Sequence, residues 1–183
     1  MFTSTVLVFV VYSLMLQSST AAKCTEYNIG LDVDNLNTYI TDSAFTSSSQ
    51  ATYGYRASRG RLNTRYEGSS DKKGGWMASS SDDNPWIEVD LQGDYSLTGI
   101  TTQGRQCGNN WVTKFQVQYK KDGDNNYFDS SGTNTAQTFD GNSDRNTEVT
   151  NSFPKLTARY IRILPTDWYG SGASLRFDLI ACD

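Results

Sequence analysis

Apolar and polar residues alternate with a period of two in several segments of the chain. The clearest segments cover residues 86–91, 114–120, 159–164 and 175–179. In the first of them, Ile87, Val89 and Leu91 would lie on one face of a strand. Long helical periodicity is lacking, so the pattern predicts a protein built from β-strands.

Turn sequences separate these segments. Asp122-Gly123 and Asp140-Gly141 each lie between strand-like stretches, and they favour hairpins because both residue types adopt positive φ at low cost. Many short strands with one polar face predict an antiparallel sandwich or jelly roll. The segment 41–61 is different, because it is rich in Ser, Tyr, Gly and Arg, and we expect a long exposed loop there.

The chain starts with an uncharged, largely apolar stretch. Residues 6–16 are nearly all apolar, and small residues follow as far as Ala22. This stretch is typical of a signal peptide, and it is shorter than the roughly 20 apolar residues of a membrane span. We therefore predict a signal peptide at 1–22 and a secreted, extracellular chain at 23–183. That length fits one domain.

The amino-acid composition excludes several classes of function. The chain has no histidine, and its formal net charge is −4. The lack of histidine excludes a histidine-based catalytic triad and a histidine-ligated zinc site. The negative charge argues against nucleic-acid binding, which depends on clustered positive charge, and against a purely electrostatic attachment to anionic lipid.

Carboxylate groups were considered as catalytic or metal-binding candidates. Glu88 and Asp90, two positions apart on one predicted strand, would lie roughly 7 Å from each other, near the spacing of an inverting glycosidase. A regular strand without a cleft favours a polar sheet face instead, so no catalytic residue is predicted. The oxygen-rich turns 82–84 and 140–144 leave a structural calcium ion as an open alternative; no other cofactor or metal is predicted.

Several short motifs occur in order along the chain. They are Ile40-Thr41-Asp42-Ser43, Arg61-Leu62-Asn63, Gly75-Trp76, the segment 86–91, Thr102-Gln103-Gly104-Arg105, Asp140-Gly141-Asn142, the segment 158–165, Trp168 and Leu175-Arg176. Together with Cys24 and Cys182, this set closely resembles the discoidin domain, the C-type module of coagulation factors 5 and 8. Residues 110–113 and 144–147 resemble the slime-mould discoidins in particular. The resemblance covers essentially all of residues 23–183.

The resemblance implies an all-β single domain: a distorted eight-stranded antiparallel jelly-roll barrel or sandwich of the galactose-binding-like type. It also implies a disulfide between Cys24 and Cys182 at one end and ligand-binding loops at the other. Members of this family are adhesion or recognition modules rather than enzymes. Their ligands include phosphatidylserine membranes, collagen, other matrix proteins and glycans, so the ligand stays open.

Two loops carry the candidate ligand-binding residues. These are Tyr53, Tyr55 and Arg56 in the first loop and Arg105, Asn109, Asn110 and Trp111 in the second. Tyrosine stacks on sugar or partner surfaces, arginine donates a planar fork to carboxylate or sulfate, and asparagine pairs with hydroxyls. The family's membrane binders have bulky apolar residues at a tip that here reads Ser47–Ala51, so membrane binding is not expected.

Each candidate also has a structural interpretation. Tyr53 and Tyr55 could plug the end of the sandwich, Trp111 could cover its mouth, and Arg105 could bond inside its own loop. We interpret Trp76, Trp86 and Trp168 as packing residues.

Two strand arginines, Arg162 and Arg176, alternate outward in the sequence pattern. Their positions predict solvated faces or cross-strand ion pairs with Glu88 or Asp178 rather than contact with a ligand.

Cys107 is the third cysteine. It is either a partly buried free thiol or the link in a covalent homodimer.

From these observations we predict a secreted, non-enzymatic adhesion or recognition module that binds an extracellular glycan or a matrix or cell-surface protein. The alternatives are binding to phosphatidylserine membranes and a structural role in an extracellular or mineralised matrix.

Overall fold

The computed structural model describes residues 24–34, 37, 39–133 and 135–183. The predicted signal peptide at 1–22 lies outside these residues. The strands are β1 (Glu26–Asn28), β2 (Phe45–Ser47), β3 (Trp76–Met77), β4 (Ile87–Gln103), β5 (Trp111–Lys120), β6 (Phe128–Asp129), β7 (Thr138–Asp140), β8 (Val149–Tyr169) and β9 (Ser174–Cys182). Three short 3₁₀ helices are η1 (Asp42–Ala44), η2 (Tyr53–Tyr55) and η3 (Ala57–Gly60). The all-β prediction is confirmed, and none of the helices in the described part is long and apolar enough to cross a membrane.

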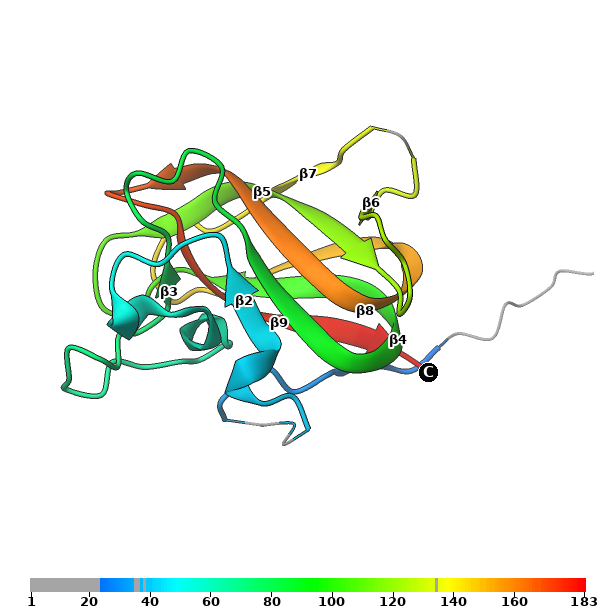
Figure 1. The fold of residues 1–183 in the computed structure, drawn as a ribbon, viewed down its shortest axis with the longest axis horizontal. Coiled ribbons are helices and arrows are strands. Elements are labelled where there is room, and N and C mark those ends of the chain that lie inside the picture. Colours follow the sequence, from blue (N-terminus) through cyan, green and yellow to red (C-terminus); the bar gives the residue numbers. More distant parts are fainter. Residues whose placement is uncertain (1–23, 35–36, 38, 134) are drawn as a thin grey trace, which may run out of the picture.

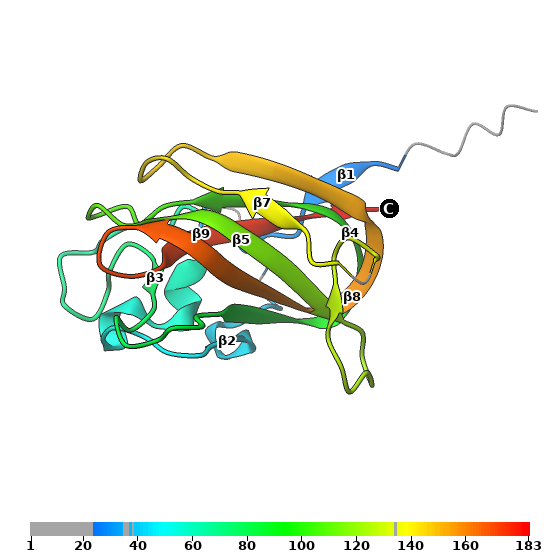
Figure 2. The same ribbon diagram turned by 90° about the horizontal axis from the view of Figure 1, so that it is seen from above.

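The strands form one sheet that folds over on itself without closing (Figure 1). Its central order is β1-β9-β4-β8-β5-β6, with β2 on β4, β3 on β9 and β7 on β5, and every strand pair is antiparallel. The described residues thus contain nine strands where eight were expected, two of them only two residues long. β4 and β8 run through most of the molecule (Figure 2), and register shifts between them bend the sheet.

The alternation in the sequence identifies the core correctly. Ile87, Val89 and Leu91 are at most 1% exposed, and Phe115 and Val117 on β5 are equally buried. These side chains pack with those of β8 and β9 in one apolar cluster between the two layers. Trp76 is fully buried, as predicted.

The prediction that the side chains of Arg176 and Asp178 lie on a solvent-exposed face of their strand is wrong. Both side chains are buried, with relative exposures of 2% and 0%. β9 is covered on both faces, because the N-terminal segment and the loops that follow β2 and β4 pack over the face that the alternation assigned to solvent. Arg162 does form the predicted ion pair with Glu88, at 2.9 Å.

The segment 41–61 is also more ordered than predicted. It contains η1, β2, η2 and η3, and it buries Ala44, Phe45 and Ala57. Arg61 is 4% exposed and its guanidinium lies over the ring of Phe45, 4.5 Å from the centroid. Small residues with an occasional large apolar one allow this segment to fold as short turns against the sheet.

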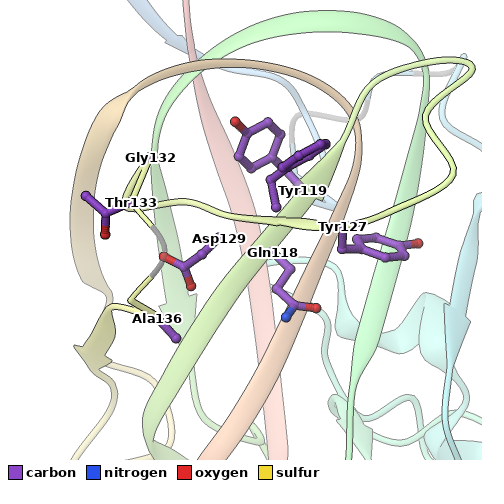
Figure 3. A pocket seen from close by; sticks show the side chains of 8 residues that line it. Gln118, Tyr119, Tyr127, Asp129, Gly132, Thr133 and Ala136 are labelled. Carbon is purple, nitrogen blue, oxygen red and sulfur yellow. The ribbon is translucent and has the colours of Figure 1, made fainter.

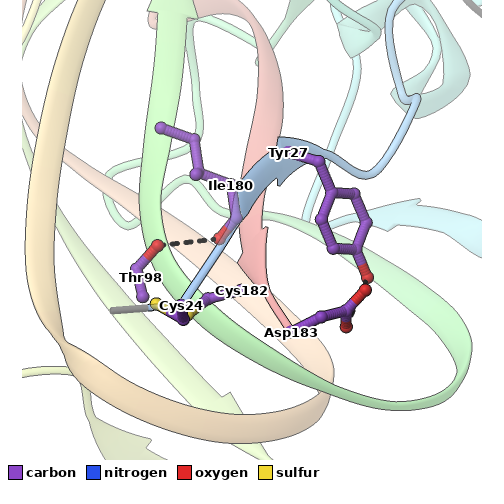
Figure 4. Close-up of a disulfide and its surroundings, with 6 residues drawn as sticks. All are labelled: Cys24, Tyr27, Thr98, Ile180, Cys182 and Asp183. Atoms are coloured by element: carbon purple, nitrogen blue, oxygen red, sulfur yellow. Dashed lines mark hydrogen bonds between the residues drawn. A yellow bond between two sulfur atoms is a disulfide. The ribbon is translucent and has the colours of Figure 1, made fainter. Parts of the chain in front are cut away.

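The predicted disulfide joins Cys24 to Cys182 (Figure 4), with Cα atoms 5.5 Å apart. Next to it, β1 pairs with β9, and Thr25 and Asp183 exchange backbone hydrogen bonds of 3.2 and 3.3 Å. Tyr27 donates a further hydrogen bond from Oη to the Asp183 carboxylate at 3.2 Å. The two ends of the described chain therefore lie side by side at one end of the sheet (Figure 1).

Candidate functional site

Five loop segments gather at the end of the sheet remote from the disulfide (Figure 1). They are residues 47–60, 65–75, 104–111, 143–147 and 169–172, and we call them the loop rim. Backbone bonds tie the first three together, from Lys73 N to Gly54 O at 3.1 Å and from Gln106 N to Gly74 O at 2.8 Å. The other two are joined to 104–111 through side chains described below. All seven candidate residues lie on this rim.

Arg105 and Tyr55 form the centre of the rim. The Arg105 guanidinium lies 5.3 Å from the centroid of the Tyr55 ring, and its Nη1 donates a hydrogen bond to Tyr55 Oη at 3.0 Å. Gly108 allows this arrangement, because a Cβ at that position would lie 1.5 Å from the Arg105 guanidinium. Arg105 Nε is buried, and no hydrogen-bond partner for it exists among the described residues. The structural alternative for Arg105 was a bond inside its own loop; its side chain bonds instead to Tyr55 of the neighbouring segment 47–60.

Tyr53 and Arg56 form a second pair on the outer part of the rim. The Tyr53 ring is 63% exposed, and the Arg56 guanidinium lies 4.8 Å from its centroid. Arg56 Nη1 also donates to the backbone oxygen of Asp71 at 2.7 Å. This contact fixes η2 against the segment 65–75 and leaves the tyrosine ring in solvent.

The two asparagines differ in exposure. Asn109 is exposed and its Oδ1 accepts a hydrogen bond from Arg145 Nε at 3.0 Å. Asn110 is 4% exposed, and its Nδ2 donates to Ser171 Oγ at 3.3 Å. Asn110 thus lies beneath the rim, whereas Asn109 and Arg145 lie on its surface.

Trp111 is paired with an aromatic residue that the sequence interpretation missed. Its indole stacks on the ring of Tyr169, with centroids 4.4 Å apart and planes inclined by 12°. Tyr169 is 54% exposed and is the direct partner of Trp111 across β5 and β8. The pairing of the two strands is the signal that would have identified Tyr169.

Arg176 supports the rim from below and was also missed. Its guanidinium donates to the backbone oxygens of Gly104, Thr64 and Arg145 at 2.7, 3.0 and 2.6 Å. Burial, together with the nearby charge of Arg65, lowers the pKa of Arg176 to about 10. The buried cation holds carbonyl groups from three loops at the base of the rim.

The rim is positively charged, although the whole chain is negative. Its cations are Arg56, Arg59, Arg65, Lys72, Lys73, Arg105 and Arg145, and its anions are Glu67, Asp71 and Asp144. Hydrogen bonds from Lys72 and Arg59 lower the pKa of Glu67 to about 2, so this carboxylate is ionised and paired at neutral pH. The unpaired charge of the rim is therefore cationic, which suits an acidic ligand.

One hollow lies away from the rim. It has a volume of about 390 Å³ and is bordered by β5, β6 and the segment after β6 (Figure 3). Tyr127 and Asp129 point to opposite sides of this hollow. Tyr127 donates to Glu88, and Asp129 Oδ1 accepts from Ser131 N at 2.8 Å, whereas the buried Asp129 Oδ2 has no hydrogen-bond partner among the described residues.

The acidic residues examined for catalysis or metal binding have partners within the chain. Asp90 receives two hydrogen bonds from Arg159 at 2.8 and 3.0 Å, and Glu88 pairs with Arg162. Burial raises the pKa of Asp90, but the Arg159 bonds outweigh this and the net pKa is lowered. No cluster of three or more His, Cys, Asp or Glu side chains in the described ranges could hold a metal ion.

The two calcium candidate turns are stabilised by hydrogen bonds. Asp82 accepts from Ser48 Oγ at 2.6 Å and from Ser49 Oγ at 2.5 Å. Asp144 accepts from Thr147 Oγ1 at 2.6 Å and from two backbone N–H groups. Calcium binding at either turn stays a prediction.

The fold is an all-β scaffold with a cluster of loops at one end. The sequence model of the F5/8 type C domain matches residues 44–179. The chain therefore belongs to the F5/8 type C, or discoidin, domain family.

Individual proteins agree with this assignment. Retinoschisin of Takifugu rubripes is 36% identical over 152 residues, which cover 78% of this chain and 51% of retinoschisin. The chain thus spans about half the length of the retinoschisins that it matches. Discoidin II of Dictyostelium discoideum is similar in structure, with a TM-score of 0.67, 28% identity, and coverage of 75% of this chain and 53% of discoidin II.

A similarity in fold extends to a family 32 carbohydrate-binding module. This module, from C. perfringens NanJ and in complex with galactose, has a TM-score of 0.57 and 19% identity, and the match covers 85% of this chain and 99% of the module.

Proposed function

We propose that this chain is a secreted, non-enzymatic adhesion module that binds an extracellular glycan or a matrix or cell-surface protein through the loop rim. The observation that carries the proposal is the combination of exposed aromatic rings with unpaired cations on one rigid end of the sheet. The galactose complex of the structurally similar NanJ module supports a glycan as ligand. Secretion is supported by the apolar leader and by the disulfide, which persists in oxidising compartments.

The rim residues divide into two roles. Tyr53, Trp111 and Tyr169 supply flat aromatic surfaces for a sugar ring or an apolar side chain. Arg145 and Arg56 supply donors for carboxylate or sulfate groups. Arg105 is a positioning residue for Tyr55. The basic charge of the rim favours ligands that carry acidic groups.

An array of extracellular glycans and matrix proteins tests the proposal. We expect Trp111→Ala and Arg145→Ala to weaken binding of the hit about tenfold or more, with a small change in melting temperature. Phe128→Ala and Lys155→Ala are matched controls, because both residues are exposed and lie outside the rim. Rim variants that bind like the wild type, or controls that bind as poorly as the rim variants, would reject the rim as the binding site.

Membrane binding is not supported by the chemistry of the tip 47–51. Ser48 and Ser49 donate their hydroxyl protons to Asp82, and Gln50 and Ala51 follow as exposed residues. Such a tip offers little apolar surface to a bilayer, where roughly 0.8 kcal/mol is gained for each buried CH₂ group. Sedimentation with vesicles that contain phosphatidylserine should leave the protein in the supernatant.

Cys107 is the free, exposed cysteine of the described chain and lies on the rim. A disulfide between two copies would place two rims against each other and make the module bivalent. Non-reducing electrophoresis should then show a dimer that is absent after reduction and in Cys107→Ser. A monomer under both conditions contradicts the dimer and leaves the single-rim proposal unaffected.

A further inference from the structure

A second hollow lies on the flank of the sheet, outside the loop rim. It has a volume of about 360 Å³. One wall is the turn 83–85, and the other is formed by Gln116 of β5 and by residues 164–166 and Trp168 of β8. Gln116 lies five residues after Trp111 along β5, roughly 17 Å by the rise of a strand, whereas Trp168 directly precedes Tyr169 of the rim. The hollow shares no lining residue with the rim.

The floor of this hollow is apolar and partly open to solvent. Leu164 is half-buried, because its neighbours on β8 point into the core, and the half-buried Trp168 stands beside it. Pro85 also lines the hollow. An indole next to aliphatic side chains is a surface on which the C–H face of a pyranose ring packs.

Polar side chains border this floor and are not used elsewhere. None of the hydrogen bonds found among the described residues involves the side chain of Asp83, Asn84, Gln116 or Thr166. Asp83, Asn84 and Thr166 are exposed, and Gln116 is half-buried. A carboxylate can accept two hydroxyl protons, and each amide offers a donor and an acceptor, which together match the hydroxyls of a sugar.

The turn that presents Asp83 and Asn84 is held in place by its neighbours. Asp82 accepts from Ser48 and Ser49 and also from the backbone N–H of Asn84, at 3.2 Å. Ser48 exchanges two further hydrogen bonds with the backbone of Trp86, at 3.0 and 2.9 Å. The turn is therefore fixed on both sides before a ligand arrives, which lowers the ordering cost of binding.

The charge of the hollow is opposite to that of the rim. Asp83 is the charged side chain among those that line the hollow; it is exposed, and no salt bridge among the described residues involves it. The nearest cation on β8, Arg162, pairs with Glu88 and lies between the rings of Trp86 and Tyr127, 4.1 Å from each. On β5, Lys114 is the register partner of Asp167 and pairs with Asp140 at 3.7 Å, so the carboxylate without a neighbouring cation is that of Asp83. A sugar with a carboxylate or sulfate would be repelled by Asp83 here.

From the apolar floor, the unused polar border and the negative charge, we propose that this hollow is a second saccharide site that takes a pyranoside without acidic groups. Trp168 and Leu164 contact the apolar face of the ring, and Asp83, Asn84 and Gln116 bind its hydroxyl or amino groups. Where the rim ligand of the proposed function is an acidic glycan, the module binds two kinds of sugar, the acidic one at the rim and a neutral or amino sugar on the flank. Two different sites on one rigid body allow bivalent attachment to a mixed glycan surface.

The test is a glycan array with neutral, amino, sialylated and sulfated saccharides, followed by calorimetry of the purified chain with each hit. We expect Asp83→Ala and Gln116→Ala to reduce affinity for a neutral or amino saccharide about tenfold, and Arg145→Ala to leave that affinity unchanged. The same Asp83 and Gln116 variants should keep the affinity of any acidic ligand of the rim. Glu26→Ala is the matched control, because this carboxylate is also exposed, forms no hydrogen bond or salt bridge among the described residues and lies outside both sites.

Three results would overturn the proposal. The first is an array and calorimetry without any neutral or amino saccharide bound at millimolar concentration. The second is a bound neutral saccharide whose affinity depends on Arg145 and not on Asp83. The third is an acidic saccharide whose binding is lost with Asp83→Ala. The first two leave the rim proposal to its own tests, because the two sites share no residue.

Discussion

The indole of Trp111 lies nearly parallel to the phenol ring of Tyr169, 4.4 Å away. The pair joins the first residue of β5 to the last residue of β8, so a flat aromatic surface is built where both strands enter the loop rim. Because the strands are fixed partners at this point, neither ring depends on a flexible loop for its position.

Tyr169→Ala tests whether this surface binds ligand. The stack contributes about 0.5–1.5 kcal/mol beyond buried area, so we expect a loss of unfolding free energy near 1 kcal/mol and a loss of rim affinity of about tenfold. Tyr169→Phe keeps the aromatic ring, so it should retain both the stability and the rim affinity of the wild type. Thermal unfolding and calorimetry with the array hit measure the two effects. A Phe variant that binds as weakly as the Ala variant would show that the hydroxyl, and not the stack, contacts the ligand.

Gly108→Ala should disturb the rim through Arg105. The backbone of Gly108 has a φ of 129°, and a Cβ there would overlap the Arg105 guanidinium. We expect a loss of roughly 2–3 kcal/mol in unfolding free energy, from strain and overlap together. Gly68→Ala is the control, because its φ is 75° but no atom lies within 4 Å of the added Cβ, so only the strain applies.

A double variant separates the two contributions. Arg105→Ala removes the guanidinium that the new Cβ would overlap. Gly108→Ala should therefore lower the unfolding free energy less in the Arg105→Ala protein than in the wild type. Equal costs in both backgrounds, measured by denaturant titration, would contradict the close contact between Arg105 and Gly108.

Asp178 predicts a pH dependence of stability. Burial raises its pKa to about 6, although the backbone N–H groups of Leu31, Asp32 and Leu179 donate to it and oppose the rise. The unfolded chain loses this proton near pH 4. Between about pH 4 and pH 6 the folded protein therefore binds a proton that the unfolded chain has lost, and this contribution to stability decreases as the pH rises, by about 3 kcal/mol in total.

Comparison with Asp178→Asn isolates the effect, because Asn cannot ionise. Denaturant titrations from pH 4 to pH 7 should show the wild type losing stability relative to the variant across this window. A difference in unfolding free energy between the two proteins that does not change from pH 4 to pH 7 would show that Asp178 does not titrate in this range. The carboxylates on the rim and the flank cancel in the comparison, since both proteins carry them.

The disulfide should dominate the stability of the domain. Cys24 and Cys182 are separated by 158 positions, and closing such a loop contributes roughly 4–5 kcal/mol in the chain-entropy model. We expect the double substitution Cys24→Ser with Cys182→Ser to lower unfolding free energy by an amount of this order, as measured by denaturant titration. Cys107→Ser, which removes an exposed thiol, should change it by less than about 0.5 kcal/mol. Equal effects of the two changes would contradict this assignment of roles.

Strand alternation predicted the core well where one face of a strand remains open to solvent. Ile87 and Phe115 are buried as expected, and the ion pair between Glu88 and Arg162 lies on the outer face. The same rule failed at Arg176, because loops from distant parts of the chain cover the second face of β9. Burial by such loops depends on tertiary packing, and the alternation of apolar and polar residues along one strand carries no information about it.

The sequence predicted which loops form the candidate site, but it predicted less well which residues of those loops are exposed. Residue type identified the exposed ring of Tyr53, but it did not distinguish Asn109 on the surface from the buried Asn110. Tyr169 escaped notice because its partner lies 58 positions away and is found only through strand pairing. The flank hollow likewise combines a turn with two strands that are distant in sequence.

The antiparallel pairing of β1 with β9 places residues 24 and 183 together, facing away from the rim (Figures 1 and 2). A label, a surface anchor or a fused partner attached at either terminus would thus point the same way and leave the recognition loops unobstructed. Copies grafted side by side on a support would all display their loops outward, which makes immobilised arrays of this domain a suitable format for measuring avidity.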